Sequence, residues 1–292
     1  MASKQSSFSC LRRYGALGGI LTLTTFFVLT GCGSTRLVLP FRFLPASVAP
    51  NDPRLLATHE AAVRGIAAIL SQELGLPVPD EFTVYVYGSR KVFEQGLIND
   101  AHVSPARAAE LSDFAIGVGK RRQLLLNDEG TDGRGREWLR LITHEMAHLC
   151  QIELAQGEGR AEQWLAEGMA EWVAFTVLER LAMDTVRQRR VGARLGIRNY
   201  ASLVAARLDL ETLGSPRGFT LRHRKEGSLP TYQLAFLMAD YLIERNGFTS
   251  MLEYFSAFGN GHDRRENFQK AFGQNLEAFE TEILTHLKTV VP

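Results

Sequence analysis

Two histidines stand four residues apart in the segment 138–152, WLRLITHEMAHLCQI. Residues i and i+4 of an α-helix share one face, so His144 and His148 can each direct a ring nitrogen at one point. Two imidazoles held in this way suit a zinc ion. Glu145 lies about 100° around the helix from His144, beside that point, and can act as a general base on a water molecule there.

A third ligand is expected from the segment 163–172, QWLAEGMAEW. Glu167 follows His148 by 167 − 148 = 19 residues. This interval is long enough to end one helix, turn through the glycine-rich segment 156–159 and return on a second helix. Glu167 would then complete a His2Glu site with one position left open, which is the arrangement of catalytic zinc.

Two neighbours of Glu167 have expected supporting roles. Glu171 lies one helical turn further on, where its carboxylate can accept the other ring N–H of His144 and fix its tautomer. Gly168 would let the two helices approach closely. The alternative is that both glutamates belong to a solvated helix face, but the apolar residues around them favour burial.

The two motifs together, HEMAH and WLAEGMAEW, resemble those of the gluzincin metallopeptidases, and most closely the peptidase-MA-like group with HExxH and WLxEGxAE. As a pattern the resemblance covers roughly Phe82 to the C-terminus. It implies an α+β, zincin-like fold, with a small N-terminal sheet and an active-site helix followed by a mostly helical C-terminal part. It also implies Zn²⁺ as the cofactor, and peptide-bond hydrolysis with Glu145 as the general base.

The resemblance further implies a strand that binds substrate. The segment 114–118 is expected to form a hairpin with 123–126 just before the HExxH helix. In related folds the strand at this place holds an extended substrate by backbone hydrogen bonds. That role would fall to Phe114, Ala115, Ile116, Gly117 and Val118. The alternative is an ordinary buried strand.

Two residues compete to stabilise the oxyanion. Tyr232 follows Pro230 at the start of an expected helix, as a catalytic tyrosine does in zinc aminopeptidases, and a phenol O–H directed at developing charge is suitable chemistry. Packing is the alternative role for Tyr232. His223 is the other candidate, because related peptidases use a histidine, but it lies in an arginine-rich segment that is expected to be a loop.

The expected function is zinc-dependent hydrolysis of a peptide or protein substrate. No motif resembles a loop that recognises an N-terminal amine, so an endopeptidase is expected rather than an aminopeptidase. One alternative is a catalytically silent scaffold of the same fold that binds a peptide or an envelope partner. Another is a hydrolase of non-peptide amides.

The N-terminus has the order of residues found in secretory signal peptides. Three basic residues within the first 13 precede the apolar run 14–29, which ends in Leu-Thr-Gly-Cys. These four residues resemble a bacterial lipobox. The resemblance implies cleavage before Cys32 and a lipid on it, and, since Gly33 is not Asp, a place in the outer membrane facing the periplasm. A transmembrane anchor is the alternative, although the run is shorter than the ~20 residues of a span.

Composition gives no reason to expect nucleic acid as a partner. The chain has 33 Lys and Arg against 32 Asp and Glu, and removal of residues 1–31 would take away three basic residues, leaving 30 − 32 = −2. Cys10 would leave with the signal peptide and Cys32 would carry lipid. Cys150 would then remain alone as a small core residue, with no intramolecular disulfide.

The expected organisation is a signal peptide (1–31), a lipidated cysteine with a proline-rich tether (32–52), and a catalytic domain (53–292) divided into an α+β part (53–155) and a helical part (156–292). Helices are expected at 53–74, 89–97, 163–181, from 229, and at 249–258, 264–272 and 276–287, with a strand at 82–87 and a loop at 214–229. Nine arginines between 187 and 224 are expected to lie on helix surfaces paired with acids. The alternatives for these arginines are acidic lipid headgroups, peptide carboxylates or nucleic acid.

Overall fold

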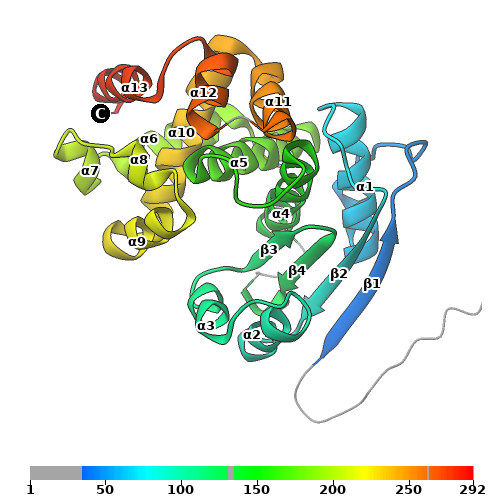
Figure 1. The fold of residues 1–292 in the computed structure, drawn as a ribbon. Coiled ribbons are helices and arrows are strands. Elements are labelled where there is room, and N and C mark those ends of the chain that lie inside the picture. The colour runs from blue at the N-terminus through cyan, green and yellow to red at the C-terminus, as the bar shows by residue number, and fades with distance from the viewer. Residues whose placement is uncertain (1–34, 131–134, 262, 292) are drawn as a thin grey trace, which may run out of the picture. The chain divides into compact units, whose positions relative to one another are not determined.

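The computed structural model describes residues 35–130, 135–261 and 263–291, so the predicted signal peptide and Cys32 lie outside the described residues. The fold is α+β, with a four-stranded sheet in the N-terminal part and helices through the rest (Figure 1). Among the described residues, no helix has the length and apolar character needed to cross a membrane.

The sheet has the strand order β1-β2-β4-β3. Its strands are β1 (Arg36–Arg42), β2 (Glu81–Tyr87), β3 (Gly117–Lys120) and β4 (Gln123–Asn127). β2 runs parallel to β4, and the two outer pairs are antiparallel. β3 is therefore an edge strand, joined to β4 by the predicted hairpin, although it begins at Gly117 rather than at Phe114.

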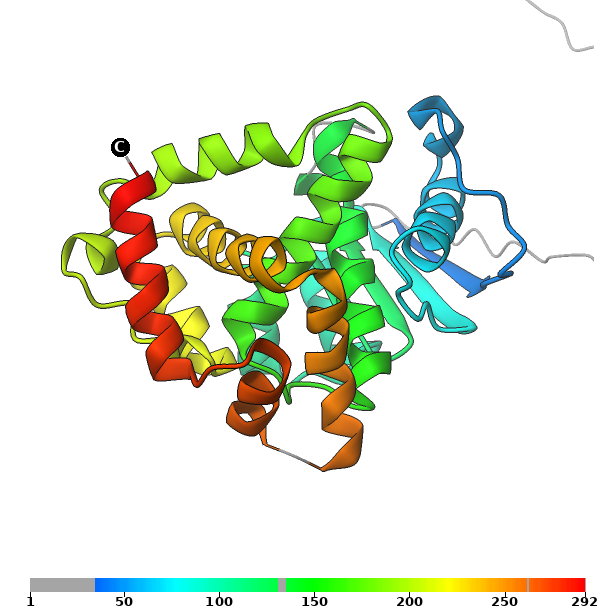
Figure 2. The ribbon, with the colours of Figure 1, turned by 90° about the horizontal axis from the view of Figure 1, so that it is seen from above.

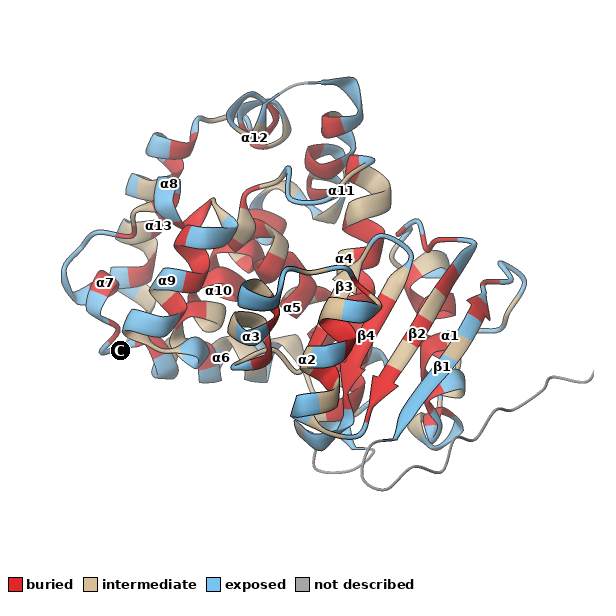
Figure 3. Ribbon diagram, turned by 60° about the horizontal axis from the view of Figure 1, so that its bottom comes forward, coloured by how far each residue is buried: buried red, intermediate tan, exposed pale blue. Residues whose placement is uncertain are grey.

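Alternate residues of β2 and β4 enter two different cores, because successive side chains of a strand point to opposite faces. Val84 and Leu124 belong to the main core, which they share with α1 (His59–Gln72). Tyr87 and Leu125 belong to a smaller core beneath α2 (Arg90–Asn99) and α3 (Pro105–Ser112). Buried residues accordingly line both central strands (Figure 3).

The prediction that 32–52 is a tether is wrong for its middle. Arg36–Arg42 forms strand β1, paired with β2 from Arg36↔Tyr87 to Arg42↔Glu81. Prolines predict an irregular chain here, but Pro40 lies in an edge strand, where its missing N–H is tolerated. The folded part of the chain thus begins well before residue 53.

Three long helices form the centre of the molecule: α4 (Arg136–Ala155), α5 (Gln163–Arg180) and α10 (Ser228–Asn246). α5 packs against α4 on one side and α10 on the other (Figure 2). Its residues are apolar nearly all round, as befits a helix buried on several faces. Gly168 faces α10 and not α4, contrary to the prediction, because a Cβ at this position would lie 2.2 Å from the carbonyl oxygen of Ala235.

Shorter helices complete the C-terminal part: α6 (Val186–Ile197), α7 (Ala201–Val204), α8 (Leu210–Leu213), α9 (Pro216–Glu226), α11 (Phe248–Ser256), α12 (Arg264–Phe272) and α13 (Leu276–Val290). The last three confirm the predicted C-terminal helices. The predicted loop at 214–229 is wrong, because α9 occupies most of it. Ser215 caps α9 by accepting the Gly218 N–H at 3.0 Å, and Pro216 begins its first turn.

Arginines of the 187–224 region pair with acids, as predicted, at four positions. Arg190 binds Asp240 through two hydrogen bonds of 2.5 and 2.9 Å. The other three pairs are Arg189 with Asp184, Arg222 with Glu226 and Arg224 with Glu110. The Arg190 pair joins α6 to α10 and the Arg224 pair joins α9 to α3, whereas the other two pairs are local. These four arginines therefore have acidic partners within the fold.

Replacing Gly168 with alanine should destabilise the protein. The added methyl group would press on the α10 backbone at Ala235, and overpacking of this kind lowers the free energy of unfolding by about 1–3 kcal/mol. Gly192→Ala on α6 is the matched control, since its methyl group meets no atom within 4 Å. That variant should be neutral or more stable by about 0.5–1 kcal/mol. Urea unfolding of both variants decides the matter, and equal stability would contradict the close contact between α5 and α10.

Candidate metal centre

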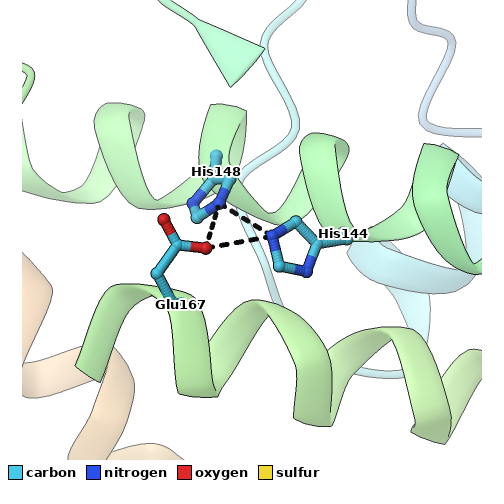
Figure 4. Close-up of side chains that lie close together, drawn as sticks. All are labelled: His144, His148 and Glu167. Atoms are coloured by element: carbon cyan, nitrogen blue, oxygen red, sulfur yellow. Dashed lines mark hydrogen bonds and ion pairs between the residues drawn. The ribbon is translucent and has the colours of Figure 1, made fainter. Parts of the chain in front are cut away.

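The three predicted ligands converge. His144 and His148 extend from α4 and Glu167 from α5, and their donor atoms point at one another (Figure 4). His144 Nε2 lies 3.1 Å from His148 Nε2 and 3.2 Å from Glu167 Oε2, and the third distance, His148 Nε2 to Glu167 Oε2, is 3.4 Å. Gln163 donates a hydrogen bond of 2.7 Å to the other carboxylate oxygen, Oε1, and so fixes the orientation of the Glu167 carboxylate.

These distances fit a metal ion. Four ligands at bond lengths of ~2.0–2.1 Å in a tetrahedron stand ~3.3 Å from one another, and the three distances between donor atoms cluster around that value. Two imidazole nitrogens and one carboxylate oxygen are also a donor set that divalent transition metals accept. The buried His-His-Glu group could therefore hold a metal ion.

Glu171 occupies the predicted place behind His144. Its Oε1 lies 3.2 Å from His144 Nδ1, the ring nitrogen directed away from the ligand group. The same oxygen accepts a hydrogen bond of 2.6 Å from Arg140 Nη1. Arg140 thus balances the charge of a carboxylate that is itself buried, and Glu171 is held at the back of the His144 ring.

Gln151 occupies the equivalent place behind His148. The sequence motifs did not predict this role. Its Oε1 lies 2.9 Å from His148 Nδ1, and its Nε2 donates a hydrogen bond of 2.9 Å to the carbonyl oxygen of Ala166. The side chain is buried. The signal available in the sequence was its position three residues after His148, on a neighbouring face of one helix.

Glu145 stands beside the ligand group and outside it. Its Oε2 accepts a hydrogen bond of 2.8 Å from the backbone N–H of Gly119 in the edge strand β3. The strand lies very close to α4, since a Cβ on Gly117 would come within 2.7 Å of Glu145 Cγ and one on Gly119 within 2.5 Å of the Glu145 carbonyl oxygen. Only glycine allows this approach, which brings the strand against the carboxylate.

Burial and mutual charge set the pKa values of the site in the metal-free protein. Burial acts to lower the pKa of His144, but hydrogen bonding to Glu167 and Glu171 outweighs it and raises the value to about 10. For Glu167 and Glu171, burial acts to raise the pKa, but the charges of His148 and Arg140 respectively dominate, so both carboxyl pKa values are lowered, that of Glu171 to about 2. Burial raises the pKa of Glu145.

A cleft of about 730 Å³ opens onto this group. All five residues of the predicted substrate strand, 114–118, line it, although only Gly117 and Val118 belong to β3. The centroid of the Tyr232 ring in the cleft lies 6.2 Å from that of His144. His223 also lines the cleft, on α9, with its ring centroid 4.2 Å from that of Phe114 and 6.1 Å from that of Tyr232.

Cys150 takes no part in the site. It is fully buried in the main core on α4, and burial raises the pKa of its thiol. This agrees with its expected role in packing.

Comparison of the chain with models of protein families, with curated proteins and with solved structures gave no match. The assignment of the site therefore depends on its own geometry.

Glu167→Ala should abolish stable metal binding. The variant loses one of three ligands, so its affinity should fall by more than the ~10–100-fold that loss of a supporting partner costs. Glu158→Ala is the control, because Glu158 also lines the cleft but stands outside the ligand group. Metal analysis after dialysis should find one divalent ion per wild-type and control chain and none in Glu167→Ala. Metal retained by the Glu167 variant would remove Glu167 from the ligand set.

Metal affinity should rise with pH. Because the pKa of His144 is raised, both of its ring nitrogens carry a proton at neutral pH in the metal-free protein. The nitrogen that binds the metal must lose its proton first. Glu167 is ionised throughout the neutral range because its pKa is lowered, so it adds no pH dependence there. Between pH 6 and 8 the apparent affinity should increase about tenfold per pH unit for each proton displaced. Competition titrations with a chelator of known pH dependence measure this, and a flat profile would contradict protonation of the empty site.

Proposed function

We propose that the protein is a zinc-dependent hydrolase of peptide bonds, with an α+β, zincin-like fold of the gluzincin type. One observation carries the proposal: three possible metal-ligand atoms converge from α4 and α5 in a cleft, and the carboxylate of Glu145, which is outside the ligand group, lies beside them. Zinc is the metal that this His2Glu donor set favours, and when bound it would act as a Lewis acid and lower the pKa of a coordinated water to about 7.

Glu145 is the proposed general base. The Gly119 N–H holds its Oε2, which leaves Oε1 free to take a proton from the attacking water. Burial raises the pKa of Glu145 above its usual value, which makes the carboxylate a stronger base. The same group can then deliver the proton to the leaving amine.

Strand β3 is the proposed support for an extended substrate. Gly119 directs its N–H at Glu145 and not at β4. Residues of an antiparallel strand alternate in this respect, so the backbone groups of Gly117, two positions earlier, also face away from β4. A peptide added along this edge would pass in front of the ligand group, which suits cleavage within a chain more than removal of its first residue.

Tyr232 is the proposed donor to the oxyanion. Its ring lies next to the ligand His144, whereas His223 lies against Phe114. Burial, together with the negative charge of Glu167, raises the pKa of Tyr232, so the phenol keeps its proton and remains a hydrogen-bond donor.

We further propose that the enzyme acts at the cell envelope as a lipoprotein anchored through Cys32, with the domain facing the periplasm. The basic, apolar and Leu-Thr-Gly-Cys order of the N-terminus supports this. The proposed partners are therefore a peptide or protein substrate and the membrane that holds the lipid.

Glu145→Gln should separate binding from catalysis. The amide keeps an oxygen for the Gly119 N–H but cannot take a proton, so hydrolysis should fall by about 10²–10⁴-fold while one zinc per chain remains. Turnover of a mixed peptide library, followed by mass spectrometry, and metal analysis give the two readouts.

Glu153→Gln is the control for this experiment and should keep wild-type rates, because Glu153 is on the same helix and does not line the cleft. Full activity of Glu145→Gln would exclude Glu145 as the base. A wild-type protein that holds zinc and cuts neither peptides nor other amides would instead be a binding scaffold.

A further inference from the structure

We infer that Gln151 is a positioning residue of the metal centre: it fixes the tautomer of His148 and couples that ligand to the helix that carries Glu167. The inference rests on the metal centre of the proposed function and concerns how this chain prepares it.

The tautomer follows from what each partner of the amide can do. The carbonyl oxygen of Ala166 only accepts hydrogen bonds, so the group that faces it at 2.9 Å must be the Gln151 amide nitrogen. The amide oxygen must then face His148 Nδ1, also at 2.9 Å. An oxygen that only accepts requires a proton on Nδ1, so a neutral His148 has its lone pair on Nε2. Nε2 is the atom that belongs to the ligand group.

The amide also links the two helices that supply the ligands. Gln151 and His148 are on α4, whereas Ala166 is on α5 and directly precedes Glu167 in the chain. Any shift of α5 relative to α4 would therefore break the Gln151 contact together with the ligand geometry. Gln151 is 4% exposed, so no solvent molecule can easily replace either hydrogen bond.

The two ligand histidines are thus held in different ways. His144 has the carboxylate of Glu171 behind it, and Arg140 neutralises this charge. His148 has a neutral amide, and no cation is paired with it among the described residues. A second carboxylate behind the rings would add to the negative charge of Glu145, Glu167 and Glu171 in a buried space. The amide supplies the required acceptor oxygen without that cost.

The test compares two substitutions in the full chain. Gln151→Met has a similar volume and no acceptor oxygen, so the affinity for Zn²⁺ should fall about 10–100-fold, the usual effect of losing such a partner. Gln151→Glu restores an acceptor for His148 Nδ1 but gives up the donor to Ala166. The buried charge that it adds is costly in the empty site, whereas bound Zn²⁺ offsets it, so the variant should recover most of the lost affinity. Affinities come from competition with a chelator, and the absorption bands of the Co²⁺-loaded proteins report the ligand geometry.

Thr143→Val is the matched control. Thr143 is fully buried on α4 and donates a hydrogen bond of 2.8 Å to the Leu139 carbonyl oxygen, and among the described residues it makes no hydrogen bond to either ligand ring. Its variant should keep the wild-type affinity and Co²⁺ spectrum even if it unfolds at a lower temperature. This separates a loss of stability from a loss of ligand positioning.

The outcomes distinguish this inference from the proposed function. Wild-type affinity and an unchanged Co²⁺ spectrum in Gln151→Met would overturn the role of Gln151 and leave the metal centre intact. Equal losses in Gln151→Met and Gln151→Glu would overturn the role of the acceptor oxygen. A wild-type chain that binds no Zn²⁺ would overturn the metal centre, and the inference about Gln151 with it.

Discussion

The contact between α4 and α5 buries several polar groups together, and each of them needs a partner. His144, Glu145, Glu167 and Glu171 all lie in the interior, where an unpartnered charge is expensive. They satisfy one another and recruit Arg140, Gln151, Gln163 and the backbone of β3. When both histidines are neutral, as metal ligands must be, three glutamates stand against one arginine in this network, and a cation at the point where the ligand atoms meet would restore balance. The packing of α4 against α5 thus creates a buried group of charges that a bound cation would stabilise.

The motif residues could be predicted because one helix and one interval fix their relation. The spacing of His144 and His148 determines that they share a face, and the 19 residues from His148 to Glu167 leave room for only one short turn between two helices. Glu171 followed from the period of the second helix. These inferences use local geometry, which an α-helix imposes whatever surrounds it.

Features that depend on tertiary packing could not be predicted from the sequence in this way. α5 is apolar on almost every side, so its sequence could not tell which neighbour Gly168 faces. The proline in β1 argues against a strand in the sequence, and only the tertiary fold shows that this strand lies at an edge of the sheet, where a proline is tolerated. The loop predicted at 214–229 is helix α9 instead, although Ser215-Pro216 is a common helix start. Gln151 carried no motif, and its role emerged only when Ala166 was placed beside it.

Two neighbouring faces of α4 carry the different polar groups of the site. One face carries the two ligand rings toward α5, and the next carries Glu145 toward the edge strand. Gly117 and Gly119 let that strand come close enough to touch the helix backbone, so the carboxylate reaches a strand N–H while remaining next to the ligand group. A larger residue at either position would push the strand outward and separate Glu145 from the edge that is proposed to hold substrate. The glycines of β3 therefore matter to the site as much as the histidines do, because they set the distance between the strand edge that is proposed to bind substrate and the carboxylate that is proposed to act as base.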